Sequence, residues 1–348
     1  YGAPFPKQDH VSVGLLGADY RIDQGHYQIA KILKGENWNP KLKAPLTQPG
    51  VDVKEGDYLL AINGDELRGD DDVSRLLMGR AGKQTVITVS ARPNMNGARQ
   101  VTVVPVGSEV SLRLRDWMEG NRKRVDDLSG GRIGYVYLPD TAGGGLTNFD
   151  RYYFSEIGKD GCIIDERFNH GGQIADYFVD VLALKPVMGA TTREGKDIIL
   201  PTTVYGPKVM LANEMSGSGG DALPWMFKKA GIGPLVGTRT WGGLVGIGGY
   251  PKLIDGATVT APRWALYGTT GQWEVENHGI APDVEVEQDP ALVRQGHDPQ
   301  LEKAVALAME ALQKTPPPKL QRPAYPDYHP TLPRVTEAPP VVAAGGNK

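Results

Sequence analysis

Ser218 lies among glycines in the stretch NEMSGSGGDALPWMFKKAG, residues 213–231. The residues before it, 209–212, have the apolar composition of a buried strand, and those after it follow a helical pattern. A serine on a turn between a strand and a helix exposes its hydroxyl beside free backbone N–H groups, which suits a nucleophile. Because serine is also a preferred helix N-cap, this motif alone leaves both roles open.

A second glycine-rich loop, RFNHGG at residues 167–172, follows a strand-like run earlier in the chain. A backbone N–H in this loop could point at the same reacting carbonyl as Ser218. An oxyanion hole needs two such donors, and loss of one costs about 3 kcal/mol in the transition state. The competing interpretation of the loop is an ordinary tight turn.

Residues 131–314 repeat a strand, a Gly- or Asn-containing loop and a helix, which predicts a largely parallel α/β core. The three units begin at GRIGYVYLPD, KDGCIIDERFN and GPKVMLANEMSG. Ligands of such cores bind beyond the carboxyl ends of the strands. Both glycine-rich loops are expected at those ends.

Residues 11–107 predict a small, mostly-β domain with short alternating strands separated by Gly, Asn and Pro turns. Its run GVDVKEGDYLLAINGDELRG, followed by the helical DDVSRLLMGRAG, resembles a PDZ domain. A PDZ groove binds peptide by adding a strand to a sheet edge. The alternative is that the domain only packs against its neighbour. Residues 108–130 are charged and helical in period, which predicts a linker helix.

The composition indicates an ordinary globular chain of 348 residues, with 40% hydrophobic and 23% charged residues. A net charge of −3 and the lack of a basic block argue against nucleic acid as a partner. No apolar run approaches the roughly 18 residues of a membrane span, so no membrane partner is expected. Cys162 has no second cysteine to pair with, and no spacing matches a metal-ligand set.

The two ends of the chain are expected to lie outside the folded domains. Residues 1–10 are interpreted as an N-terminal extension, and residues 315–348 as a proline-rich, disordered tail. The chain opens with Tyr1 rather than Met, which favours a processed product or a fragment of a longer protein. A targeting segment could then have preceded it.

Several separate motifs in one order resemble the tricorn proteases of the tail-specific serine protease clan. They are IGYVYLPD, GCIIDERFNHGG, NEMSGSGGD, GTRTWGGLVGI and VENHGIAPDVEVE, within residues 11–313. The resemblance implies an α/β protein in which a PDZ-like domain precedes a ββα-repeat protease domain of the Clp protease and crotonase type. It also implies that Ser218 is the nucleophile, that the N–H groups of Gly172 and Gly219 form the oxyanion hole, and that Glu276 completes the proton relay.

Three positions depart from the family pattern. Gly219 replaces the usual Asp, but a backbone donor survives a change of side chain. His170 occupies the first of three usual glycines and brings a titratable ring towards the site. Ala190 stands where an acidic residue would select basic substrate side chains, so the resemblance does not carry that preference over.

The general base is missing from the motifs. A serine hydroxyl needs an adjacent base near neutral pH, yet Gly243 occupies the position of the lysine used by many tail-specific proteases. Tricorn proteases use a histidine from a segment upstream of the PDZ domain, and no such segment precedes the motifs here. His170 and His278 are candidate site-lining residues, although a surface or packing role is the simpler interpretation for each. The remaining histidines are His10, His26, His297 and His329.

Two functional hypotheses follow from the sequence. The first is a serine peptidase that hydrolyses oligopeptides through an acyl-enzyme on Ser218, without a cofactor or metal, and with its histidine upstream. The second is a non-catalytic module that binds peptide ends. The resemblance further implies a homo-oligomer, a hexamer in tricorn, and a cytoplasmic location, with a periplasmic or secreted one left open.

Overall fold

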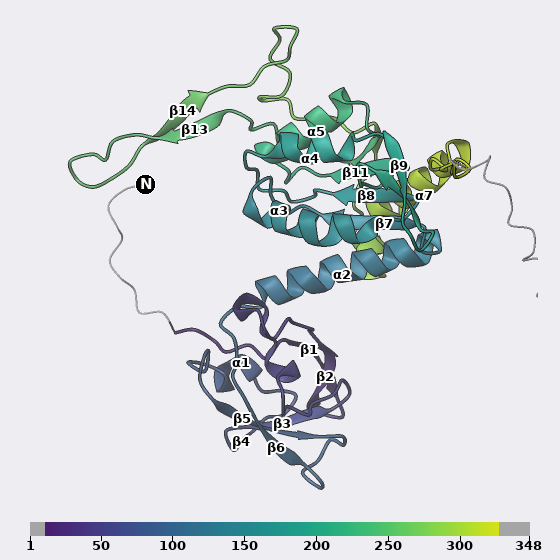
Figure 1. Ribbon diagram of the computed structural model, residues 1–348. Coiled ribbons are helices and arrows are strands. Elements are labelled where there is room, and N and C mark those ends of the chain that lie inside the picture. Colours follow the sequence, from purple (N-terminus) through teal and green to yellow (C-terminus); the bar gives the residue numbers. More distant parts are fainter. Residues whose placement is uncertain (1–10, 327–348) are drawn as a thin grey trace, which may run out of the picture.

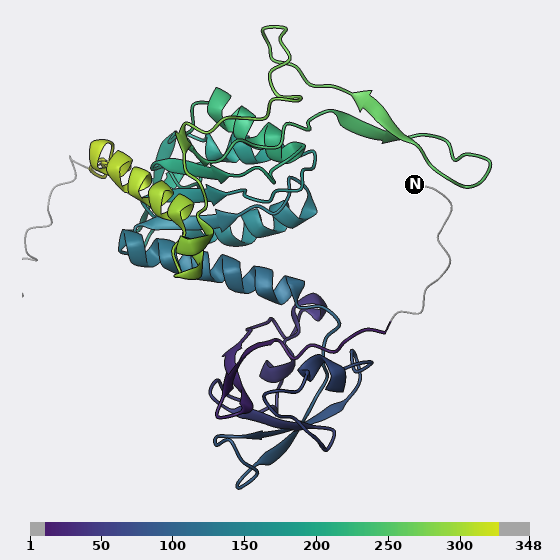
Figure 2. The same ribbon diagram turned by 180° about the vertical axis from the view of Figure 1, so that it is seen from behind.

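The computed structural model describes residues 11–326, which form two domains joined by a long helix (Figures 1 and 2). The predicted extension at residues 1–10 and most of the predicted tail, including His10 and His329, lie outside the described residues. Residues 315–326 of the tail form no helix or strand, but Arg322 pairs with Asp197 at 2.7 Å.

The first domain is a six-stranded antiparallel sheet, as the alternating strand pattern predicts. Its strands run in the order β1-β2-β3-β5-β6, with β4 paired to β3. The turn from β3 to β4 uses Asn63 and Gly64 at φ 51° and 90°, values that suit Asn and Gly. The strands are β1 (Ala18–Asp23), β2 (His26–Ile32), β3 (Tyr58–Ile62), β4 (Asp65–Glu66), β5 (Thr85–Ser90) and β6 (Arg99–Val103). Helix α1 (Val73–Leu76) begins after its N-cap, Asp72, and is only four residues long.

Helix α2 (Val110–Ser129) connects the domains and belongs to both. Near its start, Leu112 packs with Leu33 and Ala44 of the first domain. Further along, Met118 and Val125 join the core of the second domain. Its charged face is only partly solvated, because several of its side chains form ion pairs with the first domain. These pairs are Asp116 with Lys31, Arg113 with Asp19, and Arg115 with Glu36.

The second domain is built on a parallel sheet of order β15-β12-β11-β8-β7, which confirms the predicted α/β fold. Helices α2 and α7 cover one face, and α4 and α5 the other (Figures 1 and 2). The strands are β7 (Ile133–Tyr137), β8 (Gly161–Asp165), β11 (Lys208–Ala212), β12 (Leu235–Gly237) and β15 (Val284–Glu285). The helices are α3 (Gly143–Asn148), α4 (Ala175–Leu182), α5 (Gly219–Lys229), α6 (Pro290–Arg294) and α7 (Pro299–Lys314). No helix in the described range is long and apolar enough to cross a membrane.

Two hairpins lie outside the parallel sheet. One pairs β9 (Met188–Thr191) with β10 (Asp197–Leu200). The other pairs β13 (Gly246–Gly249) with β14 (Thr260–Trp264) and projects from the body of the domain as a ribbon (Figure 1). The sequence gives no sign that this ribbon stands away from the sheet.

The parallel sheet explains why distant loops meet. β8 and β11 are neighbours in register, with Leu211 opposite Asp165. Their carboxyl ends therefore lie side by side, and the loops at residues 166–172 and 213–218 start there. The predicted placement of both glycine-rich loops is confirmed by this arrangement.

Candidate active site

Ser218 occupies a strained turn between β11 and α5. It is the N-cap of α5, yet its backbone has φ 55° and ψ −114°. An N-cap normally has an extended backbone with negative φ, so capping does not require this conformation. Strained turns of this kind present nucleophiles in strand-to-helix elbows. The geometry therefore favours the nucleophile over the simple cap, although Ser218 occupies the cap position as well.

Asp221 fixes this turn from behind. Its fully buried carboxylate accepts hydrogen bonds from the Ser218 N–H at 2.8 Å, the Thr240 hydroxyl at 2.5 Å and the Gly242 and Gly243 N–H groups at 2.8 and 3.1 Å. Burial raises the pKa of Asp221, and these four bonds oppose the rise. The carboxylate thus ties the serine turn to the loop after β12. Sequence analysis missed this role because Thr240 lies 19 residues away.

The loop containing Gly171 and Gly172 lies directly against Ser218. The two glycines have φ 89° and 144°, which other residues rarely adopt. A Cβ added to Gly171 would lie 2.7 Å from the Ser218 Cβ, and one added to Gly219 would lie 2.6 Å from the Gly172 nitrogen. These contacts exclude larger residues and account for glycine at all three positions.

The N–H groups of Gly172 and Gly219 are both available to a ligand, since neither donates a hydrogen bond within residues 11–326. A Cβ on Gly219 would meet the Gly172 nitrogen and one on Gly171 would meet the Ser218 Cβ, so both unused donors lie close to Ser218. This arrangement can stabilise the negative oxygen that forms when a hydroxyl attacks a carbonyl.

Two residues that the sequence did not single out hold the loop that contains Gly171 and Gly172. The Thr141 N–H donates to the Gly171 carbonyl at 3.0 Å. The Asn169 side chain accepts from the Gly171 N–H at 2.8 Å, and its backbone carbonyl accepts from the Gly217 N–H at 3.0 Å. Thr141 follows β7, at the end of the YLPD motif, so its position at the carboxyl edge was the available signal.

A pocket of about 430 Å³ opens in front of these groups. Its lining includes Ser218, Gly172 and Gly219, so the structure brings these three predicted residues together. Most other lining side chains are apolar: Ala175, Ala222, Met226, Leu244, Ile247, Trp264 and Leu266. Asp176 supplies a carboxylate at the pocket, and its side chain is exposed.

Glu276, His170 and His278 do not line this pocket. Glu276 contacts the pocket lining indirectly, because its Oε2 accepts hydrogen bonds from the N–H groups of Leu244, a lining residue, and of Val245, both at 2.7 Å. His170 is exposed, and its backbone N–H donates to the Pro139 carbonyl. His278 is also exposed, and its carbonyl accepts from Arg239. Ala190 lies on β9 and lines a different cavity.

A buried carboxyl, Glu166, lies at the start of the loop that contains Gly171 and Gly172. Both of its oxygens are buried and lack a hydrogen-bond partner among the described residues, while the Ser216 hydroxyl donates to its backbone carbonyl. Burial, reinforced by Asp221 and Asp165, raises the pKa of Glu166 well above its ordinary value. The next residue, Arg167, is fully paired with Asp165 and Asp298. Across residues 11–326, no cluster of three His, Cys, Asp or Glu side chains could hold a metal ion.

Comparisons with known proteins agree with this architecture. Residues 14–108 match the tricorn protease PDZ domain, and residues 132–286 match peptidase family S41. Tricorn protease homolog 1 of Streptomyces coelicolor is 40% identical over 313 residues, which cover 88% of this chain and 29% of that protein. The tricorn protease of Thermoplasma acidophilum is 34% identical over 324 residues, covering 93% of this chain and 30% of that protein.

A solved structure gives the same result. The crystal structure of the tricorn protease superposes with a TM-score of 0.83 at 34% identity, covering 90% of this chain and 30% of that one. The fold is therefore that of peptidase family S41, preceded by a PDZ domain of the tricorn type. Within that class, the chain belongs to the tricorn proteases. It spans about a third of the length of the curated relatives it matches.

Proposed function

We propose that this chain carries the catalytic serine of a peptidase that hydrolyses oligopeptides. The observation that supports this most directly is the strained Ser218 turn with two unused N–H donors, from Gly172 and Gly219, at one pocket. Its relatives are tricorn proteases, which supports peptides as the substrates.

In the proposed reaction, the Ser218 oxygen attacks a peptide carbonyl and its proton passes to a general base. The N–H groups of Gly172 and Gly219 stabilise the resulting oxyanion. Collapse of this intermediate breaks the C–N bond, the leaving amine takes the proton, and an acyl-enzyme remains. Water then attacks the ester, releases the acid and restores the serine.

The base in this proposal is a histidine from a segment upstream of the chain. Two observations support this assignment: the relatives are about three times longer than this chain, and neither His170 nor His278 lines the Ser218 pocket. Glu276 is proposed to support the proton relay through its Oε1, since both of its hydrogen bonds to Leu244 and Val245 use Oε2. By the same relationship we propose a homo-oligomer, a hexamer, in the cytoplasm.

A fluorophosphonate probe tests the nucleophile. In a longer form of the protein that includes the upstream segment, the probe is expected to label Ser218, and Ser218→Ala to abolish labelling. Ser216→Ala is a matched control, because Ser216 is buried two residues away and its hydroxyl is bonded to the Glu166 carbonyl.

This chain alone is expected to hydrolyse peptides at least tenfold more slowly than the longer form.

The outcomes separate the peptidase from a module that only binds peptide. The binding module is favoured by one observation, that no described histidine lines the pocket of Ser218. Absence of labelling in both forms would remove the peptidase. Equal peptidase rates for the two forms would instead assign the base to His170 or His278.

A further inference from the structure

The size and lining of the pocket beside Ser218 indicate which substrate side chain it accepts. We propose that it is a subsite for one large apolar side chain of the peptide, of the size of Leu or Phe, next to the bond that is cut. This inference rests on the proposed peptidase function and names the substrate class of that site.

Helix α5 forms the floor of the pocket. Ser218, Ala222 and Met226 are spaced four residues apart, so they lie along one face of the helix. A side chain that enters from the Ser218 hydroxyl therefore passes over Ala222 before it reaches Met226. The small side chain of Ala222 leaves the passage open, and Met226 provides a polarisable contact further in.

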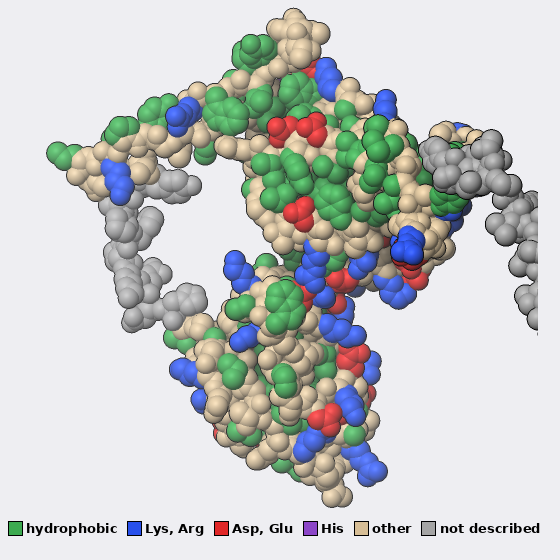
Figure 3. Space-filling view, in the orientation of Figure 1, with side chains coloured by type: hydrophobic (Ala, Val, Ile, Leu, Met, Phe, Trp, Pro, Cys, Tyr) green, Lys and Arg blue, Asp and Glu red, His purple; other side chains and the backbone are tan. Residues whose placement is uncertain are grey.

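The wall beside the ribbon is apolar, whereas Gln173 and Asp176 line the pocket next to Ala175 at the start of α4. Ala175 lies on the α4 side, while Leu244, Ile247, Trp264 and Leu266 lie in and beside the projecting ribbon. Ile247 and Trp264 keep 70% and 47% of their surfaces exposed. Figure 3 shows hydrophobic side chains along this ribbon and over the neighbouring face of the domain. An apolar substrate side chain would cover surface that water now contacts.

The single carboxylate of the lining, Asp176, does not make this a pocket for Lys or Arg. It is exposed at the first turn of α4, where a carboxylate is favoured by the helix dipole. Solvent screens such a charge, so its attraction for a basic side chain is small. Ala190 cannot supply a second acid, and it lies at another cavity.

Peptidyl phosphonates that differ only in the residue next to phosphorus test the subsite in the longer form of the protein. The rate of Ser218 labelling is expected to be about 10- to 100-fold higher with Phe or Leu than with Gly, because the pocket buries an apolar side chain. Lys and Arg probes are expected to react at least tenfold more slowly than Phe. Faster labelling by Lys or Arg, lost in Asp176→Asn, would overturn the inference.

A size change in the floor provides the second arm. Ala222→Phe fills the passage, so the ratio of the Phe rate to the Gly rate is expected to fall at least tenfold. This ratio compares two probes on one variant and does not depend on how much of that variant folds. An unchanged ratio would place the side chain elsewhere. If a simple fluorophosphonate labels Ser218 but the peptidyl phosphonates show no side-chain preference, only the subsite inference fails. If no probe labels Ser218, the proposed function fails too.

Discussion

At the residue scale, Asp221 carries more of the site than its place in the motif suggests. One carboxylate accepts hydrogen bonds from Ser218, Thr240, Gly242 and Gly243, so it holds the Ser218 turn and the loop after β12 together. Both oxygens accept two bonds each. A neutral isostere cannot satisfy these donors.

Asp221→Asn is therefore expected to lower the free energy of unfolding by about 3 to 5 kcal/mol, because in either orientation the amide NH₂ must face at least one backbone N–H donor. It is also expected to slow fluorophosphonate labelling of Ser218 at least tenfold. Chemical denaturation and labelling kinetics measure the two effects. Asp180→Asn, on the exposed face of α4, is the control and is expected to change stability by less than about 0.5 kcal/mol. Equal effects of the two variants would contradict this role.

Glu166 gives the site a pH dependence of known sign. Its pKa is raised by burial in the folded protein, so folding favours its protonated form. The stability from this group is complete below the ordinary glutamate pKa of 4.5 and is lost as the pH rises towards the folded pKa. Ionisation of Glu166 would add a third carboxylate charge beside those of Asp221 and Asp165.

Glu166→Gln removes that loss. The difference in free energy of unfolding, variant minus unsubstituted protein, is therefore expected to rise with pH above 4.5. Its slope is expected to reach up to about 1.4 kcal/mol per pH unit. Denaturation curves from pH 4 to 8 measure this. Glu194→Gln, at an exposed glutamate, is the control and should show no such slope. Parallel pH profiles for Glu166→Gln and the unsubstituted protein would refute the expectation.

At the scale of the elements, strands and loops were predictable because hydrophobic pattern and turn residues are local signals. The carboxyl-end position of both glycine loops followed from parallel strands alone. Contacts between loops were not predictable, since the bonds of Asp221 and the Thr141 support join segments far apart in sequence. Glu166 also escaped notice, because a glutamate in ERFN gives no sign of complete burial. The roles of Ser218, Gly172, Gly219 and Glu276 remain predictions.

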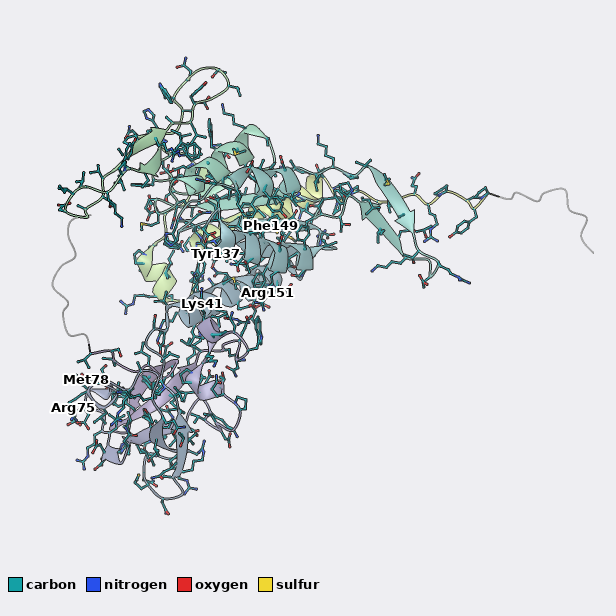
Figure 4. The ribbon with its side chains drawn as sticks, turned by 60° about the vertical axis from the view of Figure 1, so that its left-hand side comes forward. Lys41, Arg75, Met78, Tyr137, Phe149 and Arg151 are labelled. Atoms are coloured by element: carbon teal, nitrogen blue, oxygen red, sulfur yellow. The ribbon has the colours of Figure 1, made fainter. Side chains whose placement is uncertain are left out.

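At the scale of the whole molecule, the two domains meet around another buried acid. Glu36 of the first domain is 6% exposed and pairs with Arg115 and Arg151. A cavity of about 500 Å³ at this junction is lined by Lys41, Tyr137 and Arg151, which Figure 4 labels at the meeting of the domains. Arg151, foremost, lowers the pKa of Glu36, so this stabilisation is present above pH 4.5 and is lost as the pH falls.

Glu36→Gln is expected to loosen the junction, because two cations lose their partner. Limited proteolysis at residues 104–109, between β6 and α2, should then become several-fold faster. The circular dichroism spectrum of the variant should stay unchanged, which shows that the first domain remains folded. Glu66→Gln is the matched control, since its pair with Arg68 is exposed and lies within the first domain. Comparable cleavage rates for both variants would rule out Glu36 as the link.

Helix α2 is a continuous helical connection between the two domains. Its 20 residues span about 30 Å, and each end is clamped in a different hydrophobic cluster, at Leu112 and at Val125. Within the second domain, α2 packs on both β7 and α7. The segment that follows β7 carries Thr141, whose N–H holds Gly171. Helix α2 and β7 therefore connect the first domain to the loop that contains Gly171 and Gly172.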